Sequence, residues 1–269
     1  MHSENLFKRY LELLDLKLSN PSFEFLCEIT KTHLIKVPFE NISKLLHKAK
    51  GANYIPDLET YLDGIEKYNF GGTCYSNNYY LNLLLKNIGY NVTLCGADMK
   101  KPDVHLINIV TINSKKFIVD GGYAAPFLNP IPTEQIEDYI VNLGNETYLV
   151  KPKDESGRTK VEQHYNNKLQ HWYTVNPAPR VIEDFRNVIE DSYSDDAIFT
   201  NTIRITKFSE NGSLVLKNLM LTENTLTKSG TIEISRKEIP DIIQKKFGIP
   251  ADIVFEAISN LKELKNLYS

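Results

Sequence analysis

The chain has 269 residues, of which 42% are hydrophobic and 24% charged, and this composition suits a soluble globular protein with a continuous core. The formal net charge is −3, so no basic excess points to nucleic acid as a partner. No stretch reaches the roughly 18 apolar residues of a membrane span, and charges interrupt the N-terminus before a signal-peptide core forms. We therefore expect a cytoplasmic protein without a membrane partner, and the sequence leaves its oligomeric state open.

The first part of the chain has the hydrophobic spacing of helices. Serine residues are expected N-caps, a residue before proline avoids the helical conformation, and glycine is a natural helix stop. These signals are Ser3 and Ser22 as N-caps, Val37-Pro38 as a helix end, a helix over 58–68, and a helix from Cys74 to Gly89.

From residue 91 the pattern changes to short runs typical of strands. The expected strands are 91–97, 104–112, 115–121, 147–150, 160–165 and 170–175, with Pro177 and Pro179 ending the sheet. A helix over 181–192, strands over 198–208, 213–221 and 231–235, and helices over 236–246 and 251–267 are expected to follow. The order of helices, then strands, then a mixed segment predicts an α+β fold.

Cys74 is the strongest candidate nucleophile. It follows Gly71 and Gly72, which allow a sharp turn, and it is expected at a helix N-terminus, where a thiolate is favoured. The same turn offers backbone N–H groups to an oxyanion. Cys27 and Cys95 are expected to be small buried hydrophobes. The number and spacing of the three cysteines predict neither a disulfide framework nor a zinc site.

His105 and Asp120 are expected to meet on one face of a hairpin that turns at Asn113-Ser114. With a two-residue loop they are diagonal neighbours, roughly 7–8 Å apart at the backbone, and their side chains can close that gap. A carboxylate there would orient the imidazole beside a nucleophile. A structural pair that braces the sheet is the alternative, and a metal site with Cys74 lacks a fourth ligand.

The other histidines give weaker signals. His164 and His171 flank an expected turn and are predicted to face solvent, whereas His33 and His47 have no evident partner.

Together these motifs resemble the arylamine N-acetyltransferase family, which has Arg-Gly-Gly-x-Cys at a helix start, then His on a strand, then Asp-x-Gly-aromatic. The matching segments are Pro38-Phe39-Glu40-Asn41, Gly71-Gly72-Thr73-Cys74-Tyr75, Val104-His105-Leu106, Val119-Asp120-Gly121-Gly122-Tyr123, the prolines at 126, 130 and 132, Asp184-Phe185 through Phe199, and Lys246-Phe247-Gly248-Ile249. Any one motif is weak, but their order and spacing are fairly specific.

The resemblance implies a papain-like cysteine site. A helical bundle (1–90) would carry the nucleophile, a β-barrel (91–180) the His and Asp, and an α/β lid (181–269) would complete it. It implies a ping-pong reaction in which Cys74, with His105 and Asp120, takes an acetyl group from acetyl-CoA and passes it to an arylamine or hydrazine. Acetyl-CoA is then a co-substrate, with no permanently bound cofactor and no metal.

The resemblance also implies binding residues. The residues expected to bind the substrate are Phe39, Val104, Tyr123 and Phe199. The residues expected to bind the cofactor, acetyl-CoA, are Gly121 and Gly122. Core packing is an equal alternative for Phe199, and the glycine pair is too short for a phosphate-binding motif of the nucleotide kind.

Departures from the family pattern keep other hypotheses open. Phe70 stands where the family usually has Arg, and Ser76 where it usually has Glu. Glu40 is therefore expected to lose a cationic partner, so that the network is rebuilt or Glu40 is more exposed. Tyr123 replaces the commoner Phe and Ala124 a common Gly. The same three residues would serve a thiol hydrolase, a transglutaminase-like enzyme or an amide synthase, and a degenerate member would only bind CoA or an aromatic ligand.

Overall fold

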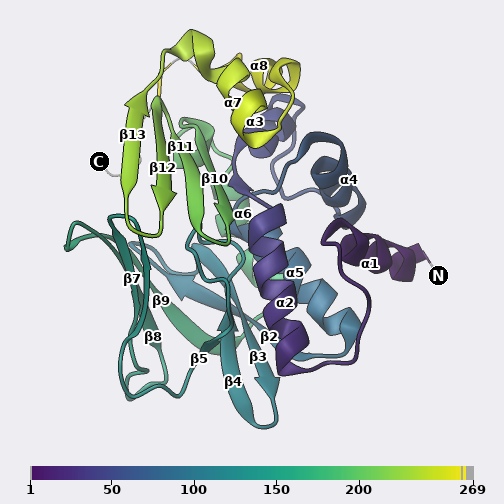
Figure 1. The fold of residues 1–269 in the computed structure, drawn as a ribbon. Helices are drawn as coiled ribbons and strands as arrows, with labels where there is room; N and C mark the ends of the chain where they lie inside the picture. Colours follow the sequence, from purple (N-terminus) through teal and green to yellow (C-terminus); the bar gives the residue numbers. More distant parts are fainter. Residues whose placement is uncertain (1, 262, 265–269) are drawn as a thin grey trace.

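The computed structural model describes residues 2–261 and 263–264, which form helices followed by two antiparallel sheets (Figure 1). The first ninety residues hold the helices α1 (His2–Leu13), α2 (Phe23–Lys36), α3 (Ile42–Ala49), α4 (Leu58–Tyr68) and α5 (Cys74–Ile88). The predicted α+β class is confirmed.

Most of the expected helix boundaries are confirmed. The Ser22 hydroxyl accepts a hydrogen bond from the Phe25 N–H at 3.1 Å, α2 ends before an extended Val37, and Gly89 ends α5 at φ 104°. The predicted cap at Ser3 is wrong, because α1 already includes this residue. Helix α3 is a helix that the sequence patterns did not indicate.

Helix α5 lies between the other N-terminal helices and the larger sheet. Its buried side chains Leu81, Leu84 and Leu85 pack in one core with residues of α1, α2, α4 and the strands below. Burying a leucine contributes roughly 1.5–3 kcal/mol, so these contacts stabilise the packing of α5 on the sheet.

The larger sheet has eight antiparallel strands that curve into a barrel-like surface (Figure 1). Its strands are β2 (Asn91–Asp98), β3 (His105–Ile112), β4 (Lys115–Val119), β5 (Ile131–Pro132), β6 (Tyr139–Leu143), β7 (Glu146–Val150), β8 (Thr159–Tyr165) and β9 (Lys168–Pro179). The order across the sheet is β5-β4-β3-β2-β9-β8-β7-β6. The predicted end of the sheet at Pro177 is wrong, since β9 continues to Pro179. These prolines are tolerated because the β2–β9 register shifts beside Gly96.

The C-terminal part contains the smaller sheet. A short helical segment, η1 (Ile182–Phe185) and α6 (Arg186–Asp191), confirms the expected helix after the barrel, and η2 (Ile198–Thr200) follows. The sheet runs in the order β1-β10-β11-β12-β13. Its strands are β1 (Phe39–Glu40), β10 (Arg204–Ser209), β11 (Gly212–Lys217), β12 (Met220–Thr225) and β13 (Ser229–Glu233).

Three expectations for this part are wrong. Residues 198–203 form η2 and a bend rather than a strand. The single strand expected over 213–221 is two strands, because Asn218 turns the chain with φ 53°. After η3 (Arg236–Glu238) and α7 (Ile239–Phe247), the last helix α8 (Ala251–Ile258) is shorter than predicted. Residues 262 and 265–267 of that prediction lie outside the described residues.

The smaller sheet is completed by a segment from the N-terminal part. Strand β1 pairs with β10, and α3 packs on α8 in a core that includes Ile42, Leu46 and Phe70. The division into 1–90, 91–180 and 181–269 therefore stays a prediction, since 39–49 belongs structurally with the last part.

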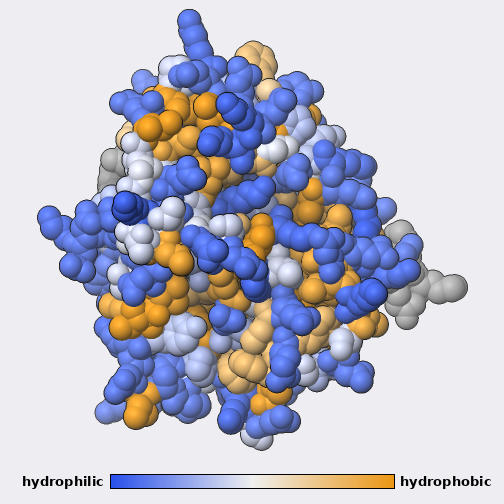
Figure 2. Space-filling model, viewed as in Figure 1, coloured by the Kyte–Doolittle hydropathy of each residue, from blue (hydrophilic) through white to orange (hydrophobic). Residues whose placement is uncertain are grey.

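The face in Figure 2 mixes hydrophobic and hydrophilic side chains. Single exposed apolar side chains such as Ile136 and Leu18 are ordinary on a folded protein. No described helix is both long and apolar enough to cross a membrane.

Asn41 fastens the C-terminal sheet to the helices. Its side-chain amide donates to the carbonyl oxygens of Phe199 (2.8 Å) and Thr202 (2.7 Å), and its oxygen accepts from the Arg204 N–H at 2.8 Å. The residue is fully buried, so water cannot replace these three bonds.

We expect Asn41→Ala to lower the free energy of unfolding by roughly 2–4 kcal/mol, because it leaves three backbone groups without partners. Urea unfolding followed by circular dichroism measures this. The exposed Asn20→Ala is the matched control and should change it by less than about 0.5 kcal/mol. Equal effects of the two variants would contradict this role of Asn41.

Candidate active site

Cys74 is the first residue of α5, as predicted. Its side chain is buried, and the first N–H groups of the helix have no partner within the helix. The preceding glycines are needed because neighbouring backbone lies too close for a Cβ atom, and neither glycine has a positive φ. A Cβ on Gly71 would lie 1.9 Å from the Pro38 carbonyl oxygen, and the Glu40 N–H donates to the Gly72 oxygen at 3.0 Å. Strand β1 thus holds the turn that presents the thiol.

His105 and Asp120 come from adjacent strands of one hairpin. Ile112 pairs with Lys115 across the Asn113-Ser114 turn, which confirms the predicted register. His105 begins β3, and Asp120 directly follows β4. The histidine Nε2 lies 2.8 Å from Oδ2 of Asp120, so the diagonal pair closes to a hydrogen bond. The Cys74 thiol lines the same cavity as this imidazole and donates to the carbonyl oxygen of Val104, the residue before His105, at 3.9 Å.

The Asp120 carboxylate is enclosed by donors. Besides His105, it accepts from the Asn78 amide (2.8 Å), the Gly122 N–H (2.9 Å) and the Tyr173 hydroxyl (2.8 Å). Its side chain is 0% exposed. A buried carboxylate with four donors is held in one position and in its charged form, which is the condition for orienting a histidine.

Electrostatics favour a protonated His105. Burial would lower its pKa, but the charge and hydrogen bond of Asp120, with a contribution from Cys74, raise the pKa to about 10. Burial would raise the pKa of Asp120, but His105, Asn78 and Gly122 keep that pKa below its usual value. The pair therefore holds an imidazolium beside the thiol at neutral pH, which suits a thiolate–imidazolium nucleophile.

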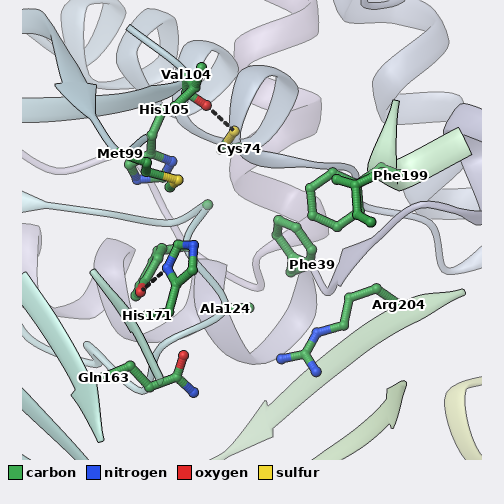
Figure 3. A pocket seen from close by; sticks show the side chains of 13 residues that line it. Phe39, Cys74, Met99, Val104, His105, Ala124, Gln163, His171, Phe199 and Arg204 are labelled. Atoms are coloured by element: carbon green, nitrogen blue, oxygen red, sulfur yellow. Dashed lines mark hydrogen bonds between the residues drawn. The ribbon is translucent and has the colours of Figure 1, made fainter. Parts of the chain in front are cut away.

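A cavity of about 200 Å³ opens beside Cys74 and His105 (Figure 3). It contains all four predicted substrate residues. Its lining residues are Phe39, Cys74, Met99, Val104, His105, Gly122, Tyr123, Ala124, Gln163, His171, Ile198, Phe199 and Arg204. The rings of Phe39 and Phe199 meet edge to face with centroids 5.6 Å apart, so one wall is aromatic. Their binding roles stay predictions, although Phe199 lies at the cavity rather than in a closed core.

The predicted solvent position of His171 is wrong. It lines the cavity, and its Nδ1 lies 2.8 Å from the Tyr123 hydroxyl. Burial, followed by the nearby positive charges of His105, Arg204 and Lys100, lowers its pKa to about 4, so His171 is neutral at pH 7. Its position depends on a register shift between Gln163 and His164 in the β8–β9 pair, which sets His171 opposite the buried Gln163. Counting back from the turn at Asn166-Asn167 without that shift would set His171 opposite Glu162, so the hairpin pattern alone does not find it.

His33 also differs from expectation, because it has a partner. Its Nε2 lies 3.0 Å from the Tyr10 hydroxyl, and the residue is fully buried. Burial lowers its pKa to about 4, so it is a neutral core histidine.

The two glycines after Asp120 have different surroundings. Gly122 lines the cavity, and a Cβ there would lie 2.7 Å from the Cys74 Cα. Gly121 is outside the cavity, and its N–H donates to the Asn78 side chain at 2.8 Å. Ala124 has φ 63°, where a glycine would be unstrained, and this costs roughly 1 kcal/mol. The cofactor role of the glycine pair stays a prediction.

Glu40 was expected either to be more exposed or to have a rebuilt hydrogen-bond network. Glu40 is fully buried, so its network is rebuilt. The carboxylate accepts from the Ser43 N–H (2.9 Å), the Ser43 hydroxyl and the Gly71 N–H (3.2 Å). Burial raises its pKa, and these bonds counter part of that rise. Phe70 instead packs in the apolar core beside α3, and the Ser76 hydroxyl donates to the Thr73 oxygen at 3.3 Å.

Lys44 is a buried cation that the sequence patterns did not indicate. Its Nζ donates to the Ser192 hydroxyl at 2.6 Å and lies 3.8 Å from the centre of the Tyr193 ring. Burial lowers its pKa to about 7, and the nearby Cys74 counters part of that decrease. The cation links α3 to the segment that follows α6.

Arylamine N-acetyltransferases are similar to this chain over most of its length. The arylamine N-acetyltransferase pineal gland isozyme NAT-3 of Gallus gallus is 29% identical over 89% of this chain and 91% of its own. Arylamine N-acetyltransferase 1 of Homo sapiens is 26% identical over 89% of this chain and 92% of its own. A family model described as N-acetyltransferase matches residues 22–254. The chain belongs to the arylamine N-acetyltransferase family.

Solved structures of this family share the fold. The arylamine N-acetyltransferase of Mycobacterium abscessus has a TM-score of 0.80 at 16% identity and covers 96% of both chains. The Salmonella typhimurium protein has a TM-score of 0.77 at 17% identity, with 97% of this chain and 94% of that chain covered. These structures show that the chain shares their fold, with N-terminal helices, a barrel-like sheet and a C-terminal α/β part. The family model and the named relatives show that it is an enzyme of the arylamine N-acetyltransferase family.

We expect Asp120→Asn to slow alkylation of Cys74 by iodoacetamide at pH 7 by at least roughly a hundredfold. Without the carboxylate, burial dominates and the pKa of His105 falls below its usual value, so that no imidazolium supports the thiolate. Alkylation rates followed by mass spectrometry over a range of pH test this. The control is Asp138→Asn, which removes a carboxylate paired with Lys151 at 2.6 Å. An unchanged alkylation profile in Asp120→Asn would contradict the electrostatic role of Asp120.

Lys44 predicts a second pH effect, on stability. Its folded pKa of about 7 lies below its usual value of 10.5, so between these pH values the unfolded chain binds more protons and stability rises with pH. Below pH 7 both states are charged and the burial cost counts in full. Lys44→Met should therefore lose this rise, which is at most about 1.4 kcal/mol per pH unit.

The effect is measured by urea unfolding from about pH 6 to about pH 9.5, as the difference in free energy of unfolding between the variant and the wild-type chain at each pH. Lys86→Met, which replaces an exposed lysine on α5, is the control and should leave that difference constant. A constant difference for Lys44→Met as well would show that Lys44 keeps its charge in the folded state.

Proposed function

We propose that the protein transfers an acetyl group from acetyl-CoA to an arylamine or hydrazine through an acetyl-Cys74 thioester. The observation that carries the proposal is that the His105 imidazole, hydrogen-bonded to Asp120, lines one aromatic-walled cavity together with Cys74 at the start of a helix. Family membership narrows the chemistry to N-acetyl transfer. The catalytic roles of the three residues are part of the proposal.

In the first half-reaction the Cys74 thiolate attacks the carbonyl carbon of acetyl-CoA. The oxyanion that forms is stabilised by N–H groups at the start of α5. When the intermediate collapses, the bond between carbon and CoA sulfur breaks, and the CoA thiolate takes the proton from the His105 imidazolium. The products are acetyl-Cys74, CoA and neutral His105.

In the second half-reaction the amine enters the cavity and attacks the acetyl-Cys74 carbonyl. Neutral His105 accepts a proton from the amine nitrogen, and the bond between carbon and Cys74 sulfur breaks. This step restores the thiolate–imidazolium pair and releases the N-acetyl product. Asp120 stays charged throughout and keeps the imidazole oriented.

The cavity walls fit a small aromatic amine. Phe39 and Phe199 supply flat apolar surface, and Val104 lies beside the thiol. Tyr123 also lines the cavity, and its hydroxyl bonds His171. Acetyl-CoA and the amine are the proposed partners, with no permanently bound cofactor. The proposal also places the enzyme in the cytoplasm.

A related acyl chemistry is the main alternative. One relative, proansamycin X synthase of Amycolatopsis mediterranei, is 25% identical over 63% of this chain and 66% of its own, so a relative of this chain carries another named activity. An amide synthase or a hydrolase would share the acyl-Cys74 intermediate and differ in its acceptor. A non-catalytic binding protein is disfavoured, because Cys74 and His105 line one cavity and Asp120 hydrogen-bonds His105.

The first test is intact-protein mass after mixing with acetyl-CoA and no amine. We expect the mass to increase by one acetyl group and to return to its starting value when an arylamine is added. Cys74→Ala should show no increase. No adduct on a thiol that still alkylates readily would point to another acyl donor, whereas an unreactive thiol would favour the binding protein.

A further inference from the structure

Lys44 lies beside the start of the nucleophile helix but outside the cavity that Cys74 lines. It lines instead a small hollow of about 20 Å³, together with Gly72 and Thr73 of the turn before Cys74 and Ser76 of the first turn of α5. A hollow of that size holds about one water molecule, and Lys44 is only 4% exposed. Solvent therefore screens little of the charge of Lys44 from the start of α5.

Two contacts fix the Lys44 ammonium in this place. Its Nζ donates to the Ser192 hydroxyl and lies over the Tyr193 ring, as described above. The Tyr193 ring packs in one buried cluster with Cys74. Tyr193 therefore contacts the ammonium and also belongs to the packed group of side chains that contains the nucleophile.

The Lys44 ammonium has no carboxylate partner among the side chains that the structure describes. No described carboxylate lies within ion-pair distance of it, whereas Lys48, one turn further along α3, pairs with Asp195 at 2.8 Å. Phe70, which stands where the family usually has Arg, lines the same hollow. The cation beside the turn before Cys74 thus comes from α3.

A buried cation at this position needs a negative charge nearby. The N-terminus of a helix carries a partial positive charge, which disfavours an ammonium, and burial without a partner adds to the cost. The charge of Cys74 counters the burial of Lys44, because it raises the pKa that burial lowers. Linkage is reciprocal, so an ammonium that is favoured by the thiolate also favours the thiolate.

The other titratable groups around Lys44 do not supply this charge. Burial and Lys50 lower the pKa of His47, so His47 is neutral at pH 7, and burial raises the pKa values of both tyrosines near Lys44. The nearby carboxylates are either exposed or already bonded elsewhere. The groups considered are His47 and Lys48 of α3, Tyr61 of α4, Tyr193, Asp191 and Asp195 around Ser192, and Glu40 of β1.

We propose that Lys44 is a positioning residue whose ammonium stabilises the Cys74 thiolate from inside the protein, beside the first turn of α5. This inference rests on the proposed function, because it concerns the same nucleophile. His105 faces the substrate cavity and exchanges protons with the reactants, whereas Lys44 lies outside that cavity and acts only through Cys74. Its charge matters when the free thiolate attacks and when Cys74 leaves the acetyl group, since the sulfur is negative in both states.

The test is the rate of Cys74 alkylation by iodoacetamide, in short pulses from about pH 4 to about pH 9. The wild-type chain is compared with Lys44→Met and Lys44→Arg by mass spectrometry of the peptide that contains Cys74. We expect the acid limb of the rate profile to have its midpoint about 0.5–1 pH unit higher in Lys44→Met, which is a rate about 3- to 10-fold lower below the midpoint. Lys44→Arg keeps the cation and should move the midpoint by less than about 0.3 pH unit.

A purely structural role of Lys44 predicts a different result. Disturbed packing would lower the rate by one factor at every pH and leave the midpoint in place, so an unchanged midpoint in Lys44→Met would overturn the proposal. A Lys44→Arg midpoint equal to that of Lys44→Met would do the same. Lys86→Met, which replaces an exposed lysine of α5, is the matched control, and an equal shift in this variant would also overturn the proposal.

Alkylation needs no acyl donor, so its outcome is independent of acetyl transfer. If the wild-type chain forms no acetyl-Cys74, the proposed function fails, and a shifted midpoint would still assign Lys44 to the thiolate. If acetyl-Cys74 forms, its rate of formation below the midpoint should fall in Lys44→Met by the same factor of about 3 to 10. An unchanged rate of formation there would overturn the role of Lys44 in the reaction.

Discussion

The charge of Asp120 is the constraint on which the rest of the site depends. A carboxylate without exposed surface is costly unless every lone pair is used, and here four donors from α5, β3, β9 and the chain after β4 use them. Those donors tie the nucleophile helix to the barrel-like sheet through Asn78, which also donates to the Leu106 oxygen. The same contacts that stabilise the fold therefore fix the orientation of His105. They also set the positions of the thiol, the imidazole and the carboxylate relative to one another.

Local sequence signals predicted the parts of the site that lie within one turn or one hairpin. The glycines before Cys74, the cap at Ser22 and the two-residue turn at Asn113-Ser114 each act over a few residues, so their patterns are sufficient. The diagonal placement of His105 and Asp120 followed from strand register alone. Family resemblance added the substrate residues, which the structure brings to one cavity although their individual roles stay predictions.

The missed features depend on pairings between distant segments. Arg204 reaches the cavity because β10 pairs with a two-residue strand more than 160 positions earlier, and so short a strand has no periodicity of its own. His171 reaches the cavity because the β8–β9 register shifts between Gln163 and His164, and the alternation of β9 does not reveal that shift. The rebuilt environment of Glu40 depends on Ser43 and on the apolar packing of Phe70, neither of which a motif comparison weighs. Tertiary contacts decided these three cases.

Strand β1 has only two residues, and their side chains point to opposite faces. Phe39 borders the cavity, while Glu40 is enclosed by the turn before Cys74 and the start of α3. A one-residue slip of β1 against β10 would exchange them, placing a carboxylate beside the thiol and an aromatic ring in a polar niche. The burial of the Glu40 carboxylate and the aromatic wall of the cavity therefore both follow from the register of β1 against β10. The cavity wall is apolar because this register turns the Glu40 carboxylate away from the cavity.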